Sequence, residues 1–427
     1  LAAGALTLAD GATLNLAGGA ASTLTVARAI PAAAGAGLEN IAVGAGTVLL
    51  TAANSYAGST GIAGGATLVV GDGATAGTIG SGTVTIAGGG TLRVDRSDTV
   101  TLANVFSGAG SLDQHGSGTT VLTADSSAAF SGAVDVTGGT LRVSGLTANA
   151  GTGTIALGTV GQLDIAGNAT VTNTITAGTG AVISASGSSG GTLGAGTLDL
   201  AAGVRLDLSA SGSGALKVTR VITDAIDDAQ LRVTGGTVSL QSANTYGGNT
   251  TVSGGTLQLS GSGTAGNGGT IALGANTLDI ADGASVSTTI TASSGATIQS
   301  STGGGTLAAG TLTLADGTAL NLAGGAGSTL TVARAIADVA GGSAETVNVT
   351  GGTVVLNLPA YEWLRSAHDA RVHTARRYTA RGAAAVLAEA GFADIATQYW
   401  NGLLLPLMVL QRKVLHRKPD APSDVTR

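Results

Sequence analysis

Short runs of alternating apolar and polar residues recur along about the first 350 residues of the chain. Clear examples are residues 83–86, 91–94, 140–143, 256–259 and 311–314, which read TVTI, TLRV, TLRV, TLQL and TLTL. A period of two places Val, Leu and Ile on one side and Thr on the other, which is the pattern of a half-buried β-strand. Gly-Gly, Asp-Gly or Ser-Gly pairs flank these runs and favour tight turns. We therefore predict many short strands joined by turns.

The alternating runs belong to larger repeats. Residues 2–30 return at residues 308–336 with about 25 of 29 positions identical, and a more diverged copy starts at Gly196. Self-similarity of this kind is typical of solenoids, in which one coil cannot bury its apolar side alone and must stack on its neighbours. The sequence therefore predicts an all-β fold, a right-handed parallel β-helix. With roughly 20 residues per coil and about 4.8 Å between coils, some 17 coils would form a rod of about 80 Å.

Composition supports a thin, repetitive core. Gly accounts for 72 residues, charged residues for 10% and aromatic residues for 2%, while hydrophobic residues reach 43%. A disordered chain would carry fewer apolar residues and more charge. The absence of cysteine excludes a disulfide scaffold, a cysteine-based zinc site and a cysteine nucleophile. The net charge of −6 argues against nucleic acid as a partner.

A change of composition near residue 356 predicts two domains, residues 1–355 and 356–427. Residues 1–356 carry 9 basic and 19 acidic residues, a net charge of about −10, whereas residues 357–427 carry 10 basic and 6 acidic residues, about +4. Aromatic residues and prolines also concentrate after the break. The chain starts at Leu1 without a signal peptide and has no run of 18 apolar residues, so we interpret it as a fragment of a longer protein.

One repeated element resembles a known family. Residues 53–68 (ANSYAGSTGIAGGATL) and 243–257 (ANTYGGNTTVSGGTL) share their order and spacing, including Asn54 and Tyr56 with Asn244 and Tyr246. A degenerate copy at residues 124–141 carries Phe130 at the tyrosine position. This element resembles the autotransporter-associated β-strand repeat.

The resemblance implies a passenger domain of a Gram-negative type V secreted protein, which is a β-helical stalk that displays adhesive or enzymatic loops. It implies an extracellular location at the bacterial outer-membrane surface, with a host or bacterial surface ligand as the unidentified partner. It connects the chain to the outer membrane only through a parent β-barrel, which this sequence does not contain.

The C-terminal residues resemble a different family. From about Val354 the chain carries NLPA at residues 357–360, His368 with Asp369, and Arg376, Arg377 and Tyr378. These residues, with AGF at 390–392, are similar to the C-terminal part of class I S-adenosylmethionine-dependent methyltransferases. The Gly-rich cofactor loop of that family has no counterpart before Val354, so we expect no cofactor binding and no methyl transfer. The join at the TVVL strand, residues 353–356, is interpreted as a splice between two families that share such a strand.

The residues of the tail also predict local structure. Thr379 is a plausible N-cap for a helix that includes residues 383–390, and Gly391 would end it. Residues 395–399 alternate and predict a strand. The sequence therefore predicts a small α/β tail after the β-helix.

Several residue patterns suggest chemistry, but each has a simpler structural explanation. Gly187, Ser189 and Gly191 satisfy the G-x-S-x-G nucleophile pattern, which a chain rich in Gly and Ser produces by chance. His115 predicts a solvated loop residue, and Asp227 with Asp228 predicts exposed loop acids rather than a glycosidase or metal pair.

Aromatic and basic residues leave two further alternatives open. Tyr56, Phe130 and Tyr246 favour packing at a coil corner, with carbohydrate stacking as the alternative. A basic patch of Arg376 and Arg377 with Lys413, Arg417 and Lys418 could bind anionic lipid, although solvated helix charges explain it more simply. The apolar segment at residues 403–410 is an aggregation hazard if it is left uncovered.

These observations favour a non-enzymatic structural or adhesive stalk, without cofactor or metal. The alternatives are a methyltransferase-like protein made inactive by its missing cofactor half, and an enzyme passenger such as a protease. The second alternative would require an inserted globular domain, and none interrupts the repeats.

Overall fold

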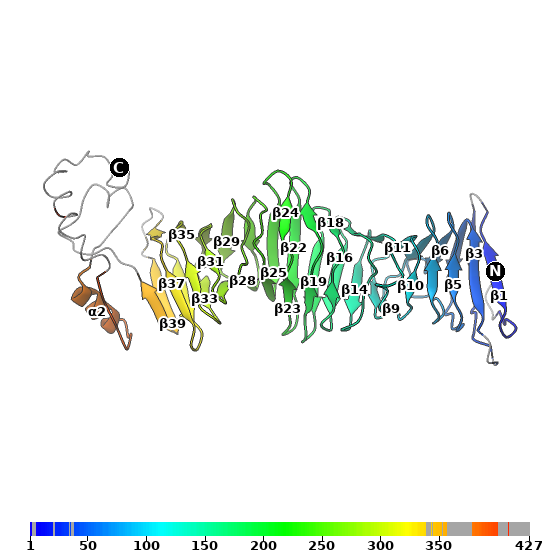
Figure 1. The fold of residues 1–427 in the computed structure, drawn as a ribbon, viewed down its shortest axis with the longest axis horizontal. Coiled ribbons are helices and arrows are strands. Elements are labelled where there is room, and N and C mark those ends of the chain that lie inside the picture. Colours follow the sequence, from blue (N-terminus) through cyan, green and yellow to red (C-terminus); the bar gives the residue numbers. More distant parts are fainter. Residues whose placement is uncertain are drawn as a thin grey trace.

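The computed structural model describes residues 6–19, 22–33, 38–338, 345–351, 353–356 and 378–399, together with residues 1, 35, 343 and 409. Residues up to 356 form a long rod of stacked coils, with the N-terminus at one end and α2 beyond the other (Figure 1). Every strand pair in the described rod is parallel, and each strand pairs with strands one coil before and one coil after it. The prediction of a right-handed parallel β-helix is therefore confirmed.

Each coil passes through three faces in a fixed order, and the strands of each face form one or two sheets. The first face consists of β1 (Thr13–Ala17), β3 (Asn40–Ala45), β5 (Thr60–Ile62), β7 (Val84–Ile86) and β10 (Phe106–Ser107), then β17 (Thr170–Val171), β20 (Gly191–Leu193), β23 (Ala215–Val218), β26 (Thr237–Leu240), β28 (Thr256–Ser260), β30 (Thr277–Ala281), β33 (Thr297–Ser300), β36 (Ala319–Gly324) and β39 (Thr346–Gly351).

The second face also contains two sheets. It consists of β2 (Thr23–Val26), β4 (Thr47–Leu50), β6 (Thr67–Val70), β8 (Thr91–Val94), β11 (Ser111–Gln114), β13 (Val134–Val136), β15 (Ile155–Leu157), β18 (Ile175–Ala177), β21 (Leu198–Leu200) and β24 (Ile222–Asp224), then β31 (Ser285–Val286), β34 (Gly305–Leu307), β37 (Thr329–Val332) and β40 (Thr353–Leu356).

The third face is one continuous sheet of 12 strands. It consists of β9 (Thr99–Leu102), β12 (Thr119–Leu122), β14 (Thr140–Ser144), β16 (Gln162–Ala166), β19 (Val182–Ser186), β22 (Arg205–Ala210), β25 (Gln230–Gly235), β27 (Thr250–Val252), β29 (Thr270–Gly274), β32 (Thr289–Ala292), β35 (Leu312–Leu314) and β38 (Ile336–Asp338).

The core consists of apolar rows that run along the rod. On the second face, Leu68, Leu92, Leu112, Val134 and Ile155 lie in one row by strand register and are all buried. The Thr and Arg residues between them point outward, as the alternation predicts. Because full burial of one such side chain contributes about 1.5–3 kcal/mol, stacking a new coil stabilises its neighbours in small equal steps.

Coil length differs from the prediction. Successive strands of the third face begin between 19 residues apart (Thr270 to Thr289) and 25 residues apart (Arg205 to Gln230). The rod therefore has about 14 coils instead of the predicted 17, which at about 4.8 Å per coil corresponds to roughly 65–70 Å. The estimate was too high because several corners carry additional residues that no strand pattern reveals.

The described part of the tail contains one helix, α2 (Ala380–Glu389). Thr379 is its N-cap and its side chain accepts a hydrogen bond from the Gly382 N–H, while Gly391 after the helix has a φ of 90°. The predicted cap and stop are confirmed. The predicted strand at residues 395–399 is wrong, because no described strand lies beside this segment to pair with it.

The predicted domain boundary at residues 355–356 coincides with the end of β40, and residues 357–377 lie outside the described residues. The division into two domains therefore stays a prediction. Among the described residues, no helix is long and apolar enough to cross a membrane.

Candidate functional site

The tyrosines of the repeated element lie inside the rod. Tyr56 and Tyr246 are both 0% exposed. Their hydroxyls hydrogen-bond to the side chains of Thr60 (2.7 Å) and Thr250 (2.6 Å), which begin the next strand of each coil. Burial raises the pKa of both tyrosines, so both phenols stay neutral. Neither ring can stack on an external carbohydrate in this arrangement.

The asparagines two residues before these tyrosines join three coils. Asn54 accepts a hydrogen bond from the Ile30 N–H (2.9 Å) and donates to the carbonyl of Thr78 (2.7 Å), one coil away on each side. Asn244 makes the same pair of contacts with Ile222 and Thr264. Because a corner has no strand ladder, its backbone groups need such partners. The motif Asn-x-Tyr therefore fixes a corner to the coils before and after it.

Phe130 takes the tyrosine position in the second copy and packs against Phe106, with ring centroids 6.1 Å apart. A glycine of the following coil faces each aromatic ring: Gly80 faces Tyr56, Gly151 faces Phe130 and Gly266 faces Tyr246. A Cβ at Gly80 would lie 2.4 Å from the Tyr56 ring. The aromatic anchors (Tyr56, Phe130 and Tyr246) thus require glycine about one coil later, which the sequence alone did not reveal.

The three copies of the element point in three different directions. Tyr56 lies between β4 of the second face and β5 of the first, at the place of the third face. Phe130 lies between β12 and β13, at the place of the first face, and Tyr246 lies between β26 and β27, at the place of the second. The spacing between copies is not a whole number of coils, so each copy is rotated by one face about the rod axis.

Buried arginines form a second device that the sequence analysis missed. Arg220 donates to five carbonyl groups, those of Gly194, Asn173, Thr197, Val171 and Ala195, which belong to the two preceding coils. Arg334 makes equivalent bonds to the carbonyls of Ala308, Thr288, Thr311 and Val286. The shared signal is V-x-R-x-I, at residues 218–222 and 332–336.

Burial lowers the pKa of Arg220 to about 10, and it lowers the pKa of Arg334 as well. Arginine can keep its charge under such desolvation because its ordinary pKa is above 12. Arg96 plays a related role, since it donates to the carbonyls of Thr75 and Gly77 and pairs with Asp98. We call Arg96, Arg220 and Arg334 the corner arginines.

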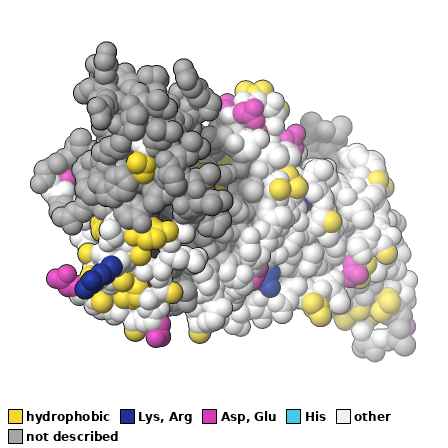
Figure 2. Space-filling view, turned by 60° about the vertical axis from the view of Figure 1, so that its left-hand side comes forward, with side chains coloured by type: hydrophobic (Ala, Val, Ile, Leu, Met, Phe, Trp, Pro, Cys, Tyr) yellow, Lys and Arg dark blue, Asp and Glu magenta, His cyan; other side chains and the backbone are white. Residues whose placement is uncertain are grey.

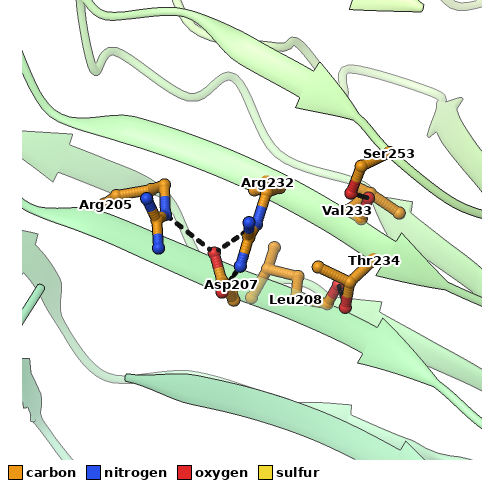
Figure 3. Close-up of polar contacts among 7 residues, drawn as sticks. All are labelled: Arg205, Asp207, Leu208, Arg232, Val233, Thr234 and Ser253. Atoms are coloured by element: carbon orange, nitrogen blue, oxygen red, sulfur yellow. Dashed lines mark hydrogen bonds and ion pairs between the residues drawn. The ribbon is translucent and has the colours of Figure 1, made fainter. Parts of the chain in front are cut away.

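Outward-facing carboxylates are paired with side chains of neighbouring coils. Arg93 contacts Asp113 at 2.7 Å and Arg142 contacts Asp164 at 2.5 Å. On the third face, Arg205 and Arg232 approach one carboxylate, that of Asp207, from two successive strands (Figure 3). These pairs neutralise most of the charge on the strand faces.

The candidate catalytic residues do not form a catalytic arrangement. Ser189 lies in an exposed turn between β19 and β20, and no helix follows it, so the strand–turn–helix context of a nucleophile elbow is missing. His115, the one histidine among the described residues, lies about three coils away. It is exposed, and its Nδ1 lies 3.2 Å from the Thr137 hydroxyl.

Asp227 and Asp228 are exposed in the loop between β24 and β25, as expected. Asp228 accepts a hydrogen bond from the Gly203 N–H. Across the described residues, no group of three or more His, Asp or Glu side chains is placed to hold a metal ion.

The third face carries a shallow groove of about 750 Å³ over β27, β29, β32 and β35. Its outward side chains are small, so the surface is hollow there. The lining residues are Thr251, Val252, Ser253, Ala272, Gly274, Ala275, Asn276, Thr291, Ala292, Ser293, Thr313 and Ala315. No charged residue is among them. Figure 2 shows that the visible described surface consists mostly of uncharged polar side chains and backbone, with charged side chains lying apart from one another.

Most of the tail residues singled out in the sequence lie outside the described residues. These are His368, Asp369, Arg376, Arg377, Lys413, Arg417 and Lys418, and all of the segment at 403–410 except Val409. Tyr378 is described and half-buried. The basic patch and the methyltransferase-like motif therefore stay predictions.

Three segments of the chain, residues 41–70, 112–143 and 235–259, match the family described as the passenger-associated-transport-repeat. Each segment contains one aromatic anchor and coincides with a copy found in the sequence, so the prediction of an autotransporter passenger repeat is confirmed for the rod. The matched segments cover less than half of the chain, and all three lie within the solenoid. No curated protein matches the chain.

Proposed function

We propose that the chain is a non-enzymatic stalk of a secreted bacterial surface protein, which holds adhesive surfaces away from the cell. One observation carries this proposal: three passenger-associated transport repeats lie within one uninterrupted parallel solenoid. A rod of stacked coils is stiff because ladder hydrogen bonds and apolar rows run along its full length. Such a rod can present its lateral faces and corner loops at a fixed distance from an anchor.

The absence of an inserted domain supports a structural role over an enzyme passenger. From Asn40 to Asp338, consecutive strands are separated only by short corners. The resemblance of the tail to methyltransferases gains no support from the described residues. We therefore retain the expectation that the chain binds no cofactor and transfers no methyl group, with an extracellular location as part of the same proposal.

A display experiment tests the stalk. The full chain, with an N-terminal epitope tag, is fused to a signal peptide and an outer-membrane β-barrel and produced in a Gram-negative host. We expect the tag to be accessible to antibody on intact cells, and the rod to resist added protease. A matched variant with Tyr246→Asp, which buries an unpaired charge in a corner, should lose protease resistance. Retention of the unmodified chain inside the cell, or its rapid digestion at the surface, would contradict the proposal.

A further inference from the structure

The groove on the third face continues directly from the charged cluster of Figure 3. Strand register places Asp207, Arg232, Thr251, Ala272, Thr291 and Thr313 in a single outward row that runs along the rod. Thr251, Ala272, Thr291 and Thr313 line the groove, and Arg232 stands immediately before them in the row. The groove therefore has one end that is marked by arginine and a floor without charge.

Two guanidinium groups share one carboxylate at this end. Arg205 Nε lies 3.2 Å from Asp207 Oδ1, and Arg232 donates to both oxygens of Asp207 through Nε and Nη2. The side chains of Arg205 and Arg232 are 41% and 36% exposed. Within the described part of the chain, both Nη atoms of Arg205 and Nη1 of Arg232 have no acceptor. One positive charge and several N–H donors thus remain available to solvent.

Neighbouring side chains add further donors. Gln230 pairs with Arg205 in register and is exposed, and Thr251 pairs with Arg232. The nearby acid Asp228 lies at the start of these strands, where the Gly203 N–H occupies one of its oxygens. An anion would therefore be favoured on the side of the arginines that faces the groove, away from this loop. Guanidinium groups recognise carboxylate and sulfate groups through paired N–H donors.

The floor of the groove suits a polyhydroxylated ligand. Its polar groups are the hydroxyls of Thr251, Ser253, Thr291, Ser293 and Thr313 and the amide of Asn276. These groups recur at the coil spacing of about 4.8 Å, so a chain of sugar rings lying along the rod would meet hydroxyls at regular intervals. Ala272 and Gly274 leave the space that the rings would occupy.

We propose that this surface binds an acidic oligosaccharide, with one carboxylate or sulfate group on Arg205 and Arg232 and the sugar rings along the groove. The proposal deepens the stalk function by naming the ligand class of one lateral face. It rests on the described side chains, whereas the stalk function rests on the repeats, so that the two can fail separately.

Binding to the purified full chain is measured by isothermal titration calorimetry with defined probes. The probes are oligogalacturonate of about six residues, a sulfated oligosaccharide of the same length, uncharged maltohexaose and inorganic sulfate. We expect saturable binding of at least one of the two acidic oligosaccharides, and much weaker binding of maltohexaose and of inorganic sulfate. The comparison of the two acidic probes decides whether carboxylate or sulfate is the preferred anion.

Two variants with matched controls locate the site. Arg205→Gln leaves Asp207 paired with Arg232, and Thr291→Tyr fills the groove from an exposed strand position. Each should weaken binding by about tenfold or more, which corresponds to the loss of a charge-assisted hydrogen bond or of the groove contacts. The controls are Lys217→Gln, which removes an exposed charge from the first face, and Thr176→Tyr, which enlarges an exposed threonine of the second face. Both should leave binding unchanged.

Several results would overturn the proposal. These are no saturable binding of either acidic oligosaccharide, equal weakening by Lys217→Gln and Arg205→Gln, or equal affinity for maltohexaose. Binding of inorganic sulfate as tight as that of the oligosaccharides would remove the role of the groove. A chain that is displayed and protease-resistant but shows one of these results would retain its stalk function and lose only this ligand.

Discussion

Nη2 of Arg220 donates a hydrogen bond to the carbonyl oxygen of Val171, 2.8 Å away and 49 residues earlier in the chain. The two residues lie two coils apart, so one side chain reaches past a whole coil. The same guanidinium also bonds to carbonyls of the coil between them, at Gly194, Ala195 and Thr197. Strand ladders join only neighbouring coils, whereas this arginine joins three.

Replacing Arg220 with methionine should therefore destabilise several coils at once. The variant leaves carbonyl groups of two coils without donors in a buried corner, and the expected cost is about 3–5 kcal/mol. Urea unfolding measures the total, and amide hydrogen exchange at residues 171–222 locates it. Lys217→Met, on an exposed strand position nearby, should change stability by less than about 0.5 kcal/mol. Unchanged exchange at residues 171–200 in Arg220→Met would show that the arginine does not join the coils energetically.

The hydroxyl and the ring of Tyr246 should contribute separately. Tyr246→Phe keeps the ring but leaves the buried Thr250 hydroxyl without its 2.6 Å partner, so we expect a loss of about 1 kcal/mol. Tyr246→Ala removes the ring from the core and should cost about 3–5 kcal/mol. Denaturant unfolding of the two variants compares these values. If the two losses were equal, the ring would not contribute to the core as its burial indicates.

Glycines of the same region should differ sharply in their tolerance of alanine. A Cβ at Gly80 would lie 2.2 Å from the Tyr56 carbonyl oxygen, whereas a Cβ at Gly88 meets nothing within 4 Å. Because neither glycine has a positive φ, the difference between them is steric. We expect Gly80→Ala to lower the thermal midpoint clearly and Gly88→Ala to leave it nearly unchanged. Equal midpoints for the two variants would contradict the close contact of Gly80 with Tyr56.

Asp135 should make stability depend on pH. Burial, and then the charge of Asp113 beside it in register, raise the pKa of this carboxyl. An acid with a raised folded-state pKa is favoured in its protonated form by folding, so its ionisation penalises the folded state above that pKa, and the penalty disappears on acidification. Asp135→Asn should therefore stabilise the chain at pH 7 and lose this advantage as the pH falls towards 4. Unfolding curves at the two pH values measure the difference, and a gain that is larger at pH 4 would contradict the assignment.

Deletions should be tolerated only in whole coils. Removal of residues 270–288 takes out one coil, since β32 then occupies the register of β29 on the third face. Removal of residues 270–279 would bring outward residues into the core. Circular dichroism and small-angle scattering should show a folded rod shortened by about 5 Å for the first deletion and a largely unfolded segment for the second. Two equally folded products would contradict the register.

The sequence by itself determined the local and repetitive properties of this protein. The alternation at residues 91–94 and 140–143 fixed which side chains point inward, because strand geometry turns each successive residue to the opposite side. Thr379 and Gly391 fixed the ends of α2, because capping depends on residues within one helical turn. The recurrence of the Asn-x-Tyr element identified the repeat family, because neighbouring coils need the same corner.

Only the tertiary structure decided what lies next to what across the coils. Arg205, Arg232 and Thr291 are dispersed in the sequence, and their meeting on one face depends on coil lengths that vary between 19 and 25 residues. The acceptors of Arg220 and the glycines that face the aromatic anchors depend on the same register. The segment at 395–399 alternates like a strand yet forms none, because a strand exists only where a neighbour supplies its hydrogen bonds. Periodicity is a property of the chain, whereas contact between coils depends on how many residues each corner uses.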